Sequence, residues 1–214
     1  MNCLMDNDVI LKLAATQFLD DWQKIAVKDG EIRVTVSAKY FFRKKKELPE
    51  KYGEAAVKAA IAFAEKTETV SGLNNPRDYE SLIELSGIDS GEALLFAAAL
   101  NLPDYLMVSG DKVALKTLQA ESRCKRFRME LKGRIIAFEQ VILALIGRGN
   151  FAVIRERIVA AEKTDTVMQV AFGLGLETTK EKATEALEYY IKKLRQETGS
   201  LLMADHQLEL LLAG

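Results

Sequence analysis

The stretch SGIDSGEALLFAAALNLPDYLMVSGDKVALKTL, residues 86–118, decides the fold class that we expect for this chain. It predicts a helix that begins after an acidic turn, a short strand over residues 104–109, and a second helix from Lys112 onward. The opening residues, MNCLMDNDVI, repeat the second half of this pattern, because a short apolar strand over residues 2–5 runs into an acidic turn and a helix. Both segments therefore predict a strand followed by the helix that covers it.

The remaining sequence continues the alternation of strands and helices. Residues 32–38 (IRVTVSA) predict a second strand, residues 124–131 (CKRFRMEL) predict a last edge strand, and everything after Gly133 predicts helices. This order indicates an α/β fold with a mostly parallel sheet flanked by helices. We expect an α/β domain over residues 1–132 and a C-terminal helical extension over residues 133–214, which can pack on the same core.

The composition excludes several classes of protein. The chain has 214 residues, of which 49% are hydrophobic, and its 30 basic and 31 acidic side chains give a formal net charge of -1. These values argue against a disordered chain and against a wholly basic nucleic-acid coat. The 2 cysteines have no paired spacing, and no apolar run has the length of a membrane span or the context of an export signal. We therefore expect a cytoplasmic protein with no membrane partner.

Acidic residues stand just beyond two of the predicted strands. Asp6 follows the first strand directly, and Asp111 follows the strand that ends at Ser109. In parallel sheets, ligands bind beyond the carboxyl ends of the strands, near the point where the strand order reverses. Neighbouring carboxylates repel one another unless a cation lies between them, and Mg²⁺ and Mn²⁺ prefer oxygen ligands. Asp6, Glu92 and Asp111 are therefore candidate ligands of one of these cations.

The same acids also have a simpler explanation as helix caps. Asp6 and Asp111 each precede a predicted helix, and Asp89 and Glu92 have the spacing of a capping box. Taken singly, each acid is better explained as a cap. Taken together with their placement at strand ends, they favour a metal site.

Three segments resemble the PIN-domain family of Mg²⁺/Mn²⁺-dependent ribonucleases, which includes the toxin nucleases of toxin–antitoxin pairs. LMDNDVILKLA resembles the opening strand of the family, SGEALLFAAAL its acidic helix start, and YLMVSGDKVAL its late strand with a Ser/Thr-x-Asp turn. The resemblance implies that Asp6, Glu92 and Asp111 are the catalytic metal ligands. It further implies that Asp8 supports the metal and that Ser109 steadies the turn at Asp111.

The chain departs from the family pattern at one position. The family has a glutamate early in the helix after its second strand, whereas this chain has VSAKYFFRKKK there, and Glu47 lies further on. A missing ligand would weaken metal binding. The alternative is therefore a catalytically degenerate PIN-like fold that binds a protein or a nucleic acid. The resemblance covers residues 1–130 and implies no role for the helices that follow.

These observations lead to a functional hypothesis with two alternatives. We expect a Mg²⁺- or Mn²⁺-dependent endoribonuclease in which a metal-activated water attacks RNA phosphodiesters. The degenerate binding module is the first alternative, and a phosphatase of small phosphates that uses the same acids is the second. RNA is the expected substrate, an antitoxin or another protein is a candidate partner, and a homodimer is a candidate assembly.

Basic residues supply candidate contacts to nucleic acid. Arg43 and Lys44 lie in a basic run beside the aromatic residues 40–42, and Lys112 follows Asp111. Such side chains can hold a phosphate backbone and stack on bases. For the run at Arg43 we favour a solvated helix end whose aromatic side chains lie in the core.

Overall fold

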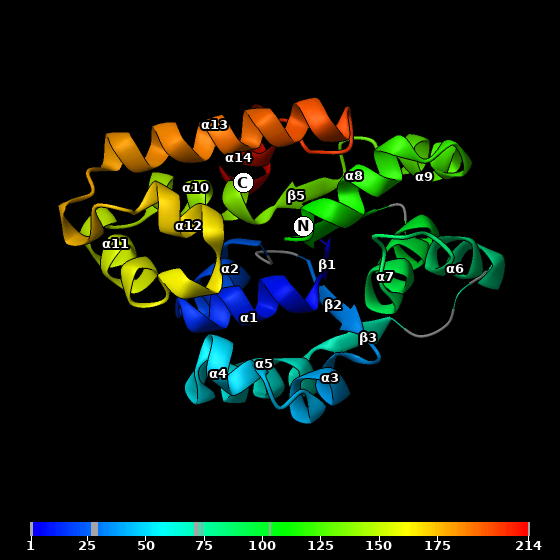
Figure 1. The fold of residues 1–214 in the computed structure, drawn as a ribbon, viewed down its shortest axis with the longest axis horizontal. Coiled ribbons are helices and arrows are strands. Elements are labelled where there is room, and N and C mark those ends of the chain that lie inside the picture. The colour runs from blue at the N-terminus through cyan, green and yellow to red at the C-terminus, as the bar shows by residue number, and fades with distance from the viewer. Residues whose placement is uncertain (1, 27–29, 71–72, 74, 103, 214) are drawn as a thin grey trace.

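The computed structural model describes residues 2–26, 30–70, 73, 75–102 and 104–213, and it shows an α/β fold (Figure 1). The described residues form a parallel sheet of 5 strands in the order β3-β2-β1-β4-β5. The strands are β1 (Asn2–Met5), β2 (Ile32–Thr35), β3 (Glu68–Val70), β4 (Tyr105–Ser109) and β5 (Ile135–Ala137). The predicted α/β class and the mostly parallel sheet are confirmed.

Helices surround this sheet and connect its strands. In chain order they are α1 (Asn7–Ala15), α2 (Leu19–Ala26), α3 (Ala38–Lys44), α4 (Leu48–Tyr52), α5 (Glu54–Lys66), α6 (Pro76–Ile83), α7 (Ser90–Asn101), α8 (Lys112–Ala120), α9 (Lys125–Glu130), α10 (Phe138–Arg148), α11 (Phe151–Ala160), α12 (Thr166–Ala171), α13 (Lys180–Thr198) and α14 (Asp205–Ala213). In Figure 1, α3, α4 and α5 lie below α1, and α13 runs along the opposite side of the molecule.

The sheet is covered on both faces, and its strands are apolar for that reason. Successive side chains of a strand point to opposite faces. Cys3 and Met5 of β1 accordingly join a core cluster with α1, α2, α5 and α10, whereas Leu4 joins a second cluster with α7, α8 and α9. Each fully buried leucine, isoleucine or phenylalanine contributes about 1.5–3 kcal/mol to this packing.

Two predictions about strands are wrong. The segment CKRFRMEL is mainly the helix α9, where Phe127 is buried in the second cluster and Arg128 donates hydrogen bonds to the carbonyls of Leu118 and Glu121. The last strand is instead β5, in a region predicted to be helical throughout. β5 is short, apolar and directly followed by α10, so its sequence cannot be told from the start of a buried helix. The edge strand β3 was not predicted, because its 3 residues show no periodicity.

Residues beyond position 132 complete the sheet and its core. β5 pairs with β4, and Leu202 forms a further parallel bridge to Ile135. The backbone N–H of Met203 donates to the carbonyl of Ile135 at 2.7 Å, so this segment covers the edge of β5. Helices α10 to α13 share the first core cluster with α1. The division into residues 1–132 and 133–214 stays a prediction.

The length and the hydropathy of the described helices test whether any of them could cross a membrane. None of them combines the length and the apolar character that crossing a lipid bilayer requires. The expected cytoplasmic location stays a prediction.

Candidate active site at the carboxyl edge of the sheet

The strand order reverses between β1 and β4, and this reversal sets the position of the candidate site. From β1 the chain adds β2 and β3 on one side of the sheet, and it then returns to add β4 and β5 on the other side. The helix that follows β1 packs on one face and the helix that follows β4 packs on the other. The loops after these two strands therefore diverge, which is where α/β proteins bind ligands.

Asp6 and Asp111 both lie at this reversal point. Met5 pairs with Val108 in the sheet, and the backbone N–H of Asp6 donates to the carbonyl of Val108 at 3.0 Å. Asp6 begins the connection to α1, and Asp111 ends the short connection from β4 to α8. The structure thus brings together the two strand-end acids that the sequence singled out.

The helix-cap explanation holds for Asp111 and for the pair Asp89 and Glu92. Asp111 Oδ1 accepts the backbone N–H of Ala114 at 2.8 Å, which caps α8. Asp89 Oδ1 accepts the N–H of Glu92, and Glu92 Oε2 accepts the N–H of Asp89, both at 2.8 Å, so the predicted capping box at α7 is confirmed. Asp6 occupies the cap position of α1 but accepts no side-chain cap hydrogen bond. Its carboxylate therefore does not cap α1 as Asp111 caps α8, although a hydrogen bond from the backbone of Asn7 partly offsets the rise in its pKa.

The acids at this edge influence one another's ionisation. Burial, reinforced by the negative charges of Asp8, Asp111 and Asp89, raises the pKa of Asp6 to about 7. Burial and a hydrogen bond to the Asp111 side chain raise the pKa of Glu92. Asp111 is thus linked to Glu92 by a hydrogen bond and to Asp6 by charge, and we call these three residues the acidic cluster. Across the described ranges, however, no three His, Cys, Asp or Glu side chains are grouped at the spacing of ligands to one metal ion.

Ser109 and Gly110 shape the turn that carries Asp111. Ser109 Oγ accepts the backbone N–H of Asp111 at 3.3 Å, a contact that suits the supporting role implied by the resemblance. At Gly110, an added Cβ would lie 2.7 Å from Asp8 Oδ2 and 3.2 Å from Lys12 Nζ. The turn thus packs directly against the Asp8–Lys12 pair, and it does so because the residue between Ser109 and Asp111 has no side chain.

Asp8 is held entirely by contacts within the protein. Its Oδ1 accepts the Tyr52 hydroxyl at 2.8 Å, and its Oδ2 lies 2.5 Å from Lys12 Nζ. Asp8 and Lys12 are one helical turn apart on α1, and Tyr52 reaches them from α4. Asp8 therefore joins α1 to α4 beside the acidic cluster.

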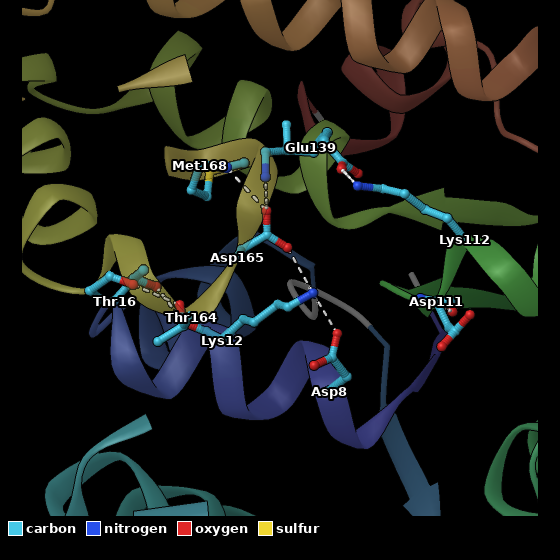
Figure 2. A network of polar contacts seen from close by, with 12 residues as sticks. Asp8, Lys12, Thr16, Asp111, Lys112, Glu139, Thr164, Asp165 and Met168 are labelled. Atoms are coloured by element: carbon cyan, nitrogen blue, oxygen red, sulfur yellow. Dashed lines mark hydrogen bonds and ion pairs between the residues drawn. The ribbon is translucent and has the colours of Figure 1, made fainter. Parts of the chain in front are cut away.

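Lys12 connects α1 to the C-terminal helices. Figure 2 shows its side chain extending from α1 between the carboxylates of Asp8 and Asp165. Lys12 Nζ lies 2.8 Å from Asp165 Oδ2, while Asp165 Oδ1 accepts the backbone N–H groups of Val167 and Met168 and so caps α12. Burial opposes the charge on Lys12, but Asp8 and Asp165 outweigh it and raise the pKa of Lys12. Lys12 is thus a charged, buried cation at the carboxyl edge.

The three residues that the sequence predicted to contact nucleic acid have different environments in the structure. Lys112 Nζ lies 2.5 Å from Oε1 of Glu139, a residue that is only 2% exposed. Figure 2 shows the two side chains directed toward each other. Arg43 pairs with Glu65. Lys44 is exposed and has no ion-pair partner among the described residues. Only Lys44 of these three is free to meet a phosphate without first giving up a carboxylate.

Replacing Gly110 by alanine is expected to lower the free energy of unfolding by about 1–3 kcal/mol, because the methyl group must displace the paired Asp8 and Lys12 side chains. Equilibrium unfolding in urea measures the change. Gly147→Ala is the matched control: an added Cβ there meets no atom within 4 Å, and alanine favours the helix, so this variant should gain about 0.5–1 kcal/mol. A Gly110→Ala protein as stable as the wild type would contradict the close packing.

Several residues of this edge were not singled out by the sequence. They are Lys12, Tyr52, Glu139 and Asp165. The spacing of Asp8 and Lys12 is the one usable signal, because charged residues four apart on a helix are neighbours. Nothing local indicates that Asp165 meets Lys12, since that contact requires α12 to pack beside α1.

In comparisons with known proteins, no family model, curated protein or solved structure matches the chain.

Proposed function

We propose that this chain is a PIN-like, metal-dependent endoribonuclease. One observation carries the proposal: Asp6 and Asp111 follow the two strands on either side of the reversal point of the sheet, and the Glu92 carboxyl shares a hydrogen bond with the Asp111 side chain. The resemblance of the three segments around these acids to PIN ribonucleases supports RNA as the substrate. An antitoxin partner and a homodimer stay predictions.

The donor set suits a hard divalent cation. Carboxylate oxygens are the ligands that Mg²⁺ and Mn²⁺ prefer, and the described edge offers no thiol or imidazole beside these acids. Glu92 and Asp111 share a hydrogen bond, which relieves the repulsion between their carboxyl groups. To hold the ion, Asp6, Glu92 and Asp111 would have to come closer together than they stand in this structure. The ion, when bound, would lower the pKa of a water molecule and neutralise charge on the phosphodiester.

The chain's own residues orient these acids. The cap hydrogen bonds at Ala114 and Asp89 orient Asp111 and Glu92, and both helix ends add partial positive charge near the substrate phosphate. Both oxygens of Asp8 are bonded to Tyr52 and Lys12, so we assign Asp8 to positioning α1 rather than to direct ligation.

Cleavage of single-stranded RNA tests the proposal. We expect the purified protein to cut a labelled, unstructured RNA in Mn²⁺, to stop when EDTA is added in excess, and to resume when Mn²⁺ is restored. The same RNA annealed to its complement is the control, and it shows whether cleavage requires the RNA to be single-stranded. Intact RNA in the presence of Mn²⁺, with a correctly folded protein, would rule out this activity.

The alternative, a binding module without catalysis, has one specific observation in its favour. Three further carboxylates of this edge are already engaged by lysines: Asp8 and Asp165 share Lys12, and Glu139 pairs with Lys112. Calorimetric titration with Mn²⁺ separates the two candidates. Binding that disappears in Asp6→Asn supports the nuclease, whereas a wild-type protein that binds no Mn²⁺ supports the module.

A further inference from the structure

The segment from α3 to α4 carries a concentration of positive charge, which we call the basic strip. It has six basic and two acidic side chains over residues 38–52, in a chain whose net charge is -1. The basic residues are Lys39, Arg43, Lys44, Lys45, Lys46 and Lys51. Arg43 pairs with Glu65, and Lys45 lies 4.0 Å from Glu47. Lys44, Lys46 and Lys51 are exposed and form no ion pair with any described residue.

Aromatic rings alternate with these charges. Tyr40 is 52% exposed, in contrast to the buried Phe42, so the expectation that these aromatic side chains lie in the core holds for Phe42 and fails for Tyr40. Lys39 Nζ lies 5.5 Å from the centre of the Tyr40 ring, and Lys45 Nζ lies 4.6 Å from that of Phe41. The exposed Tyr40 therefore leaves part of its ring available for contact with another molecule.

The basic strip borders the acidic cluster. α3 begins just after β2, whose Val34 pairs with Met5 at the end of β1. α4 ends at Tyr52, whose hydroxyl donates to Asp8 at 2.8 Å. Figure 1 shows α3 and α4 on one side of α1, away from α13. The carboxylates repel a phosphate backbone, whereas the adjacent lysines attract one.

We infer that the basic strip is the docking surface for the single-stranded RNA that the proposed function requires. Lys44, Lys46 and Lys51 contact backbone phosphates, and Tyr40 stacks on a base. Single-stranded nucleic acid fits better than an acidic protein, because the strip combines unpaired ammonium groups with an exposed ring, and every base offers a face for stacking. The inference rests on the proposed function only for the cleavage that follows docking.

Binding measured without metal tests the strip separately from catalysis. The probe is a fluorescein-labelled oligouridine, with fluorescence anisotropy recorded in EDTA over a range of salt concentrations. The triple variant Lys44→Gln/Lys46→Gln/Lys51→Gln should lower the slope of log affinity against log salt by about 2, from about 0.7 for each lost phosphate contact. Tyr40→Ala should weaken binding about five- to 100-fold.

A second triple variant and a second probe complete the design. Lys182→Gln/Lys192→Gln/Lys193→Gln removes the same charge from exposed positions of α13 and should leave the slope and the affinity almost unchanged. An abasic oligonucleotide of equal length should bind wild type more weakly and should not distinguish Tyr40→Ala from wild type.

The outcomes separate this inference from the proposed function. Equal effects of the two triple variants, or equal binding of the abasic probe to wild type, would overturn docking on the strip and indicate a general polyanion surface. Metal-dependent cleavage with an unaltered KM in the strip variants would overturn the strip and leave the nuclease standing. RNA binding that depends on the strip, with no cleavage in Mn²⁺, would uphold the strip and remove the nuclease.

Discussion

Replacing Lys12 by methionine is expected to lower the free energy of unfolding by about 3–5 kcal/mol, because it leaves the buried Asp165 and the partly buried Asp8 without their cation. The Lys12 side chain is 9% exposed and lies within ion-pair distance of both Asp8 and Asp165, whose side chain is 6% exposed. Methionine keeps most of the apolar stem and removes only the ammonium group. Equilibrium unfolding in urea at neutral pH measures the loss.

Lys58→Met is the matched control for Lys12→Met. Lys58 also pairs with an acid four residues earlier on a helix, Glu54 at 3.7 Å, but its side chain is 78% exposed. Water screens that pair, so the control should change the free energy of unfolding by less than about 0.5 kcal/mol. Equal effects of the two substitutions would show that burial does not set the strength of the Lys12 network.

The effect of Lys12→Met should depend on pH. Burial alone would raise the pKa of Asp165, but the charge of Lys12 and its hydrogen bond hold that pKa below the usual range. A lowered carboxyl pKa stabilises the fold above the unfolded value of about 3.9 and loses this contribution as the pH falls. Lys12, whose pKa is raised, contributes below about pH 10.4 and loses its contribution as the pH rises through its folded value. The difference from wild type should therefore shrink below about pH 4.

Replacing Asp6 by asparagine is expected to reduce metal-dependent RNA cleavage by at least about 100-fold, since substitutions of outer-shell partners already cost about 10- to 100-fold. The same change removes a buried carboxyl group whose negative charge is opposed by the charges of Asp8, Asp111 and Asp89. Stability should accordingly stay equal or rise while activity falls, a combination that misfolding cannot produce. Initial cleavage rates in Mn²⁺ and urea unfolding of the same preparation measure both quantities.

Asp111→Asn separates the cap role of Asp111 from its proposed metal role. Asparagine is as good a helix cap as aspartate, so the hydrogen bond to Ala114 and the stability of α8 should survive. Cleavage should nevertheless fall about as far as in Asp6→Asn. Asp20→Asn, an exposed acid in the first turn of α2, controls for net charge and should cleave like wild type. Undiminished activity in both Asp6→Asn and Asp111→Asn would remove the proposed nuclease.

The parts of the fold that the sequence predicted are those with a local signal. β1, β2, β4 and α8 have apolar runs bounded by turns or by acidic caps, and the capping box at Asp89 follows from its spacing. The missed strands β3 and β5 have 3 residues each and no periodicity of their own. They become strands because β2 and β4 offer unpaired edges beside them.

The residues of the candidate site likewise fall into those that a local sequence feature indicates and those that depend on tertiary packing. Asp6 and Asp111 could be selected from the sequence because an acid at the carboxyl end of a strand is a local feature, and parallel strands bring such ends to one edge. Glu92 was selected as part of an acidic helix start and by the resemblance to the family. The exposure of Tyr40 could not be predicted, because it depends on how α3 packs against α5 and so buries Phe42 instead.

The sequence by itself thus determined the α/β class, the helix caps and the two acids beyond β1 and β4, because helix periodicity, strand length and capping are set by residues close together in the chain. Only the tertiary structure decided the strand order, the contact of Tyr52 with Asp8 and the position of Lys12 between Asp8 and Asp165. These contacts join α1 to α4 and α12. They form because core packing brings those helices together, and a buried ammonium group is stable there only where carboxylates surround it.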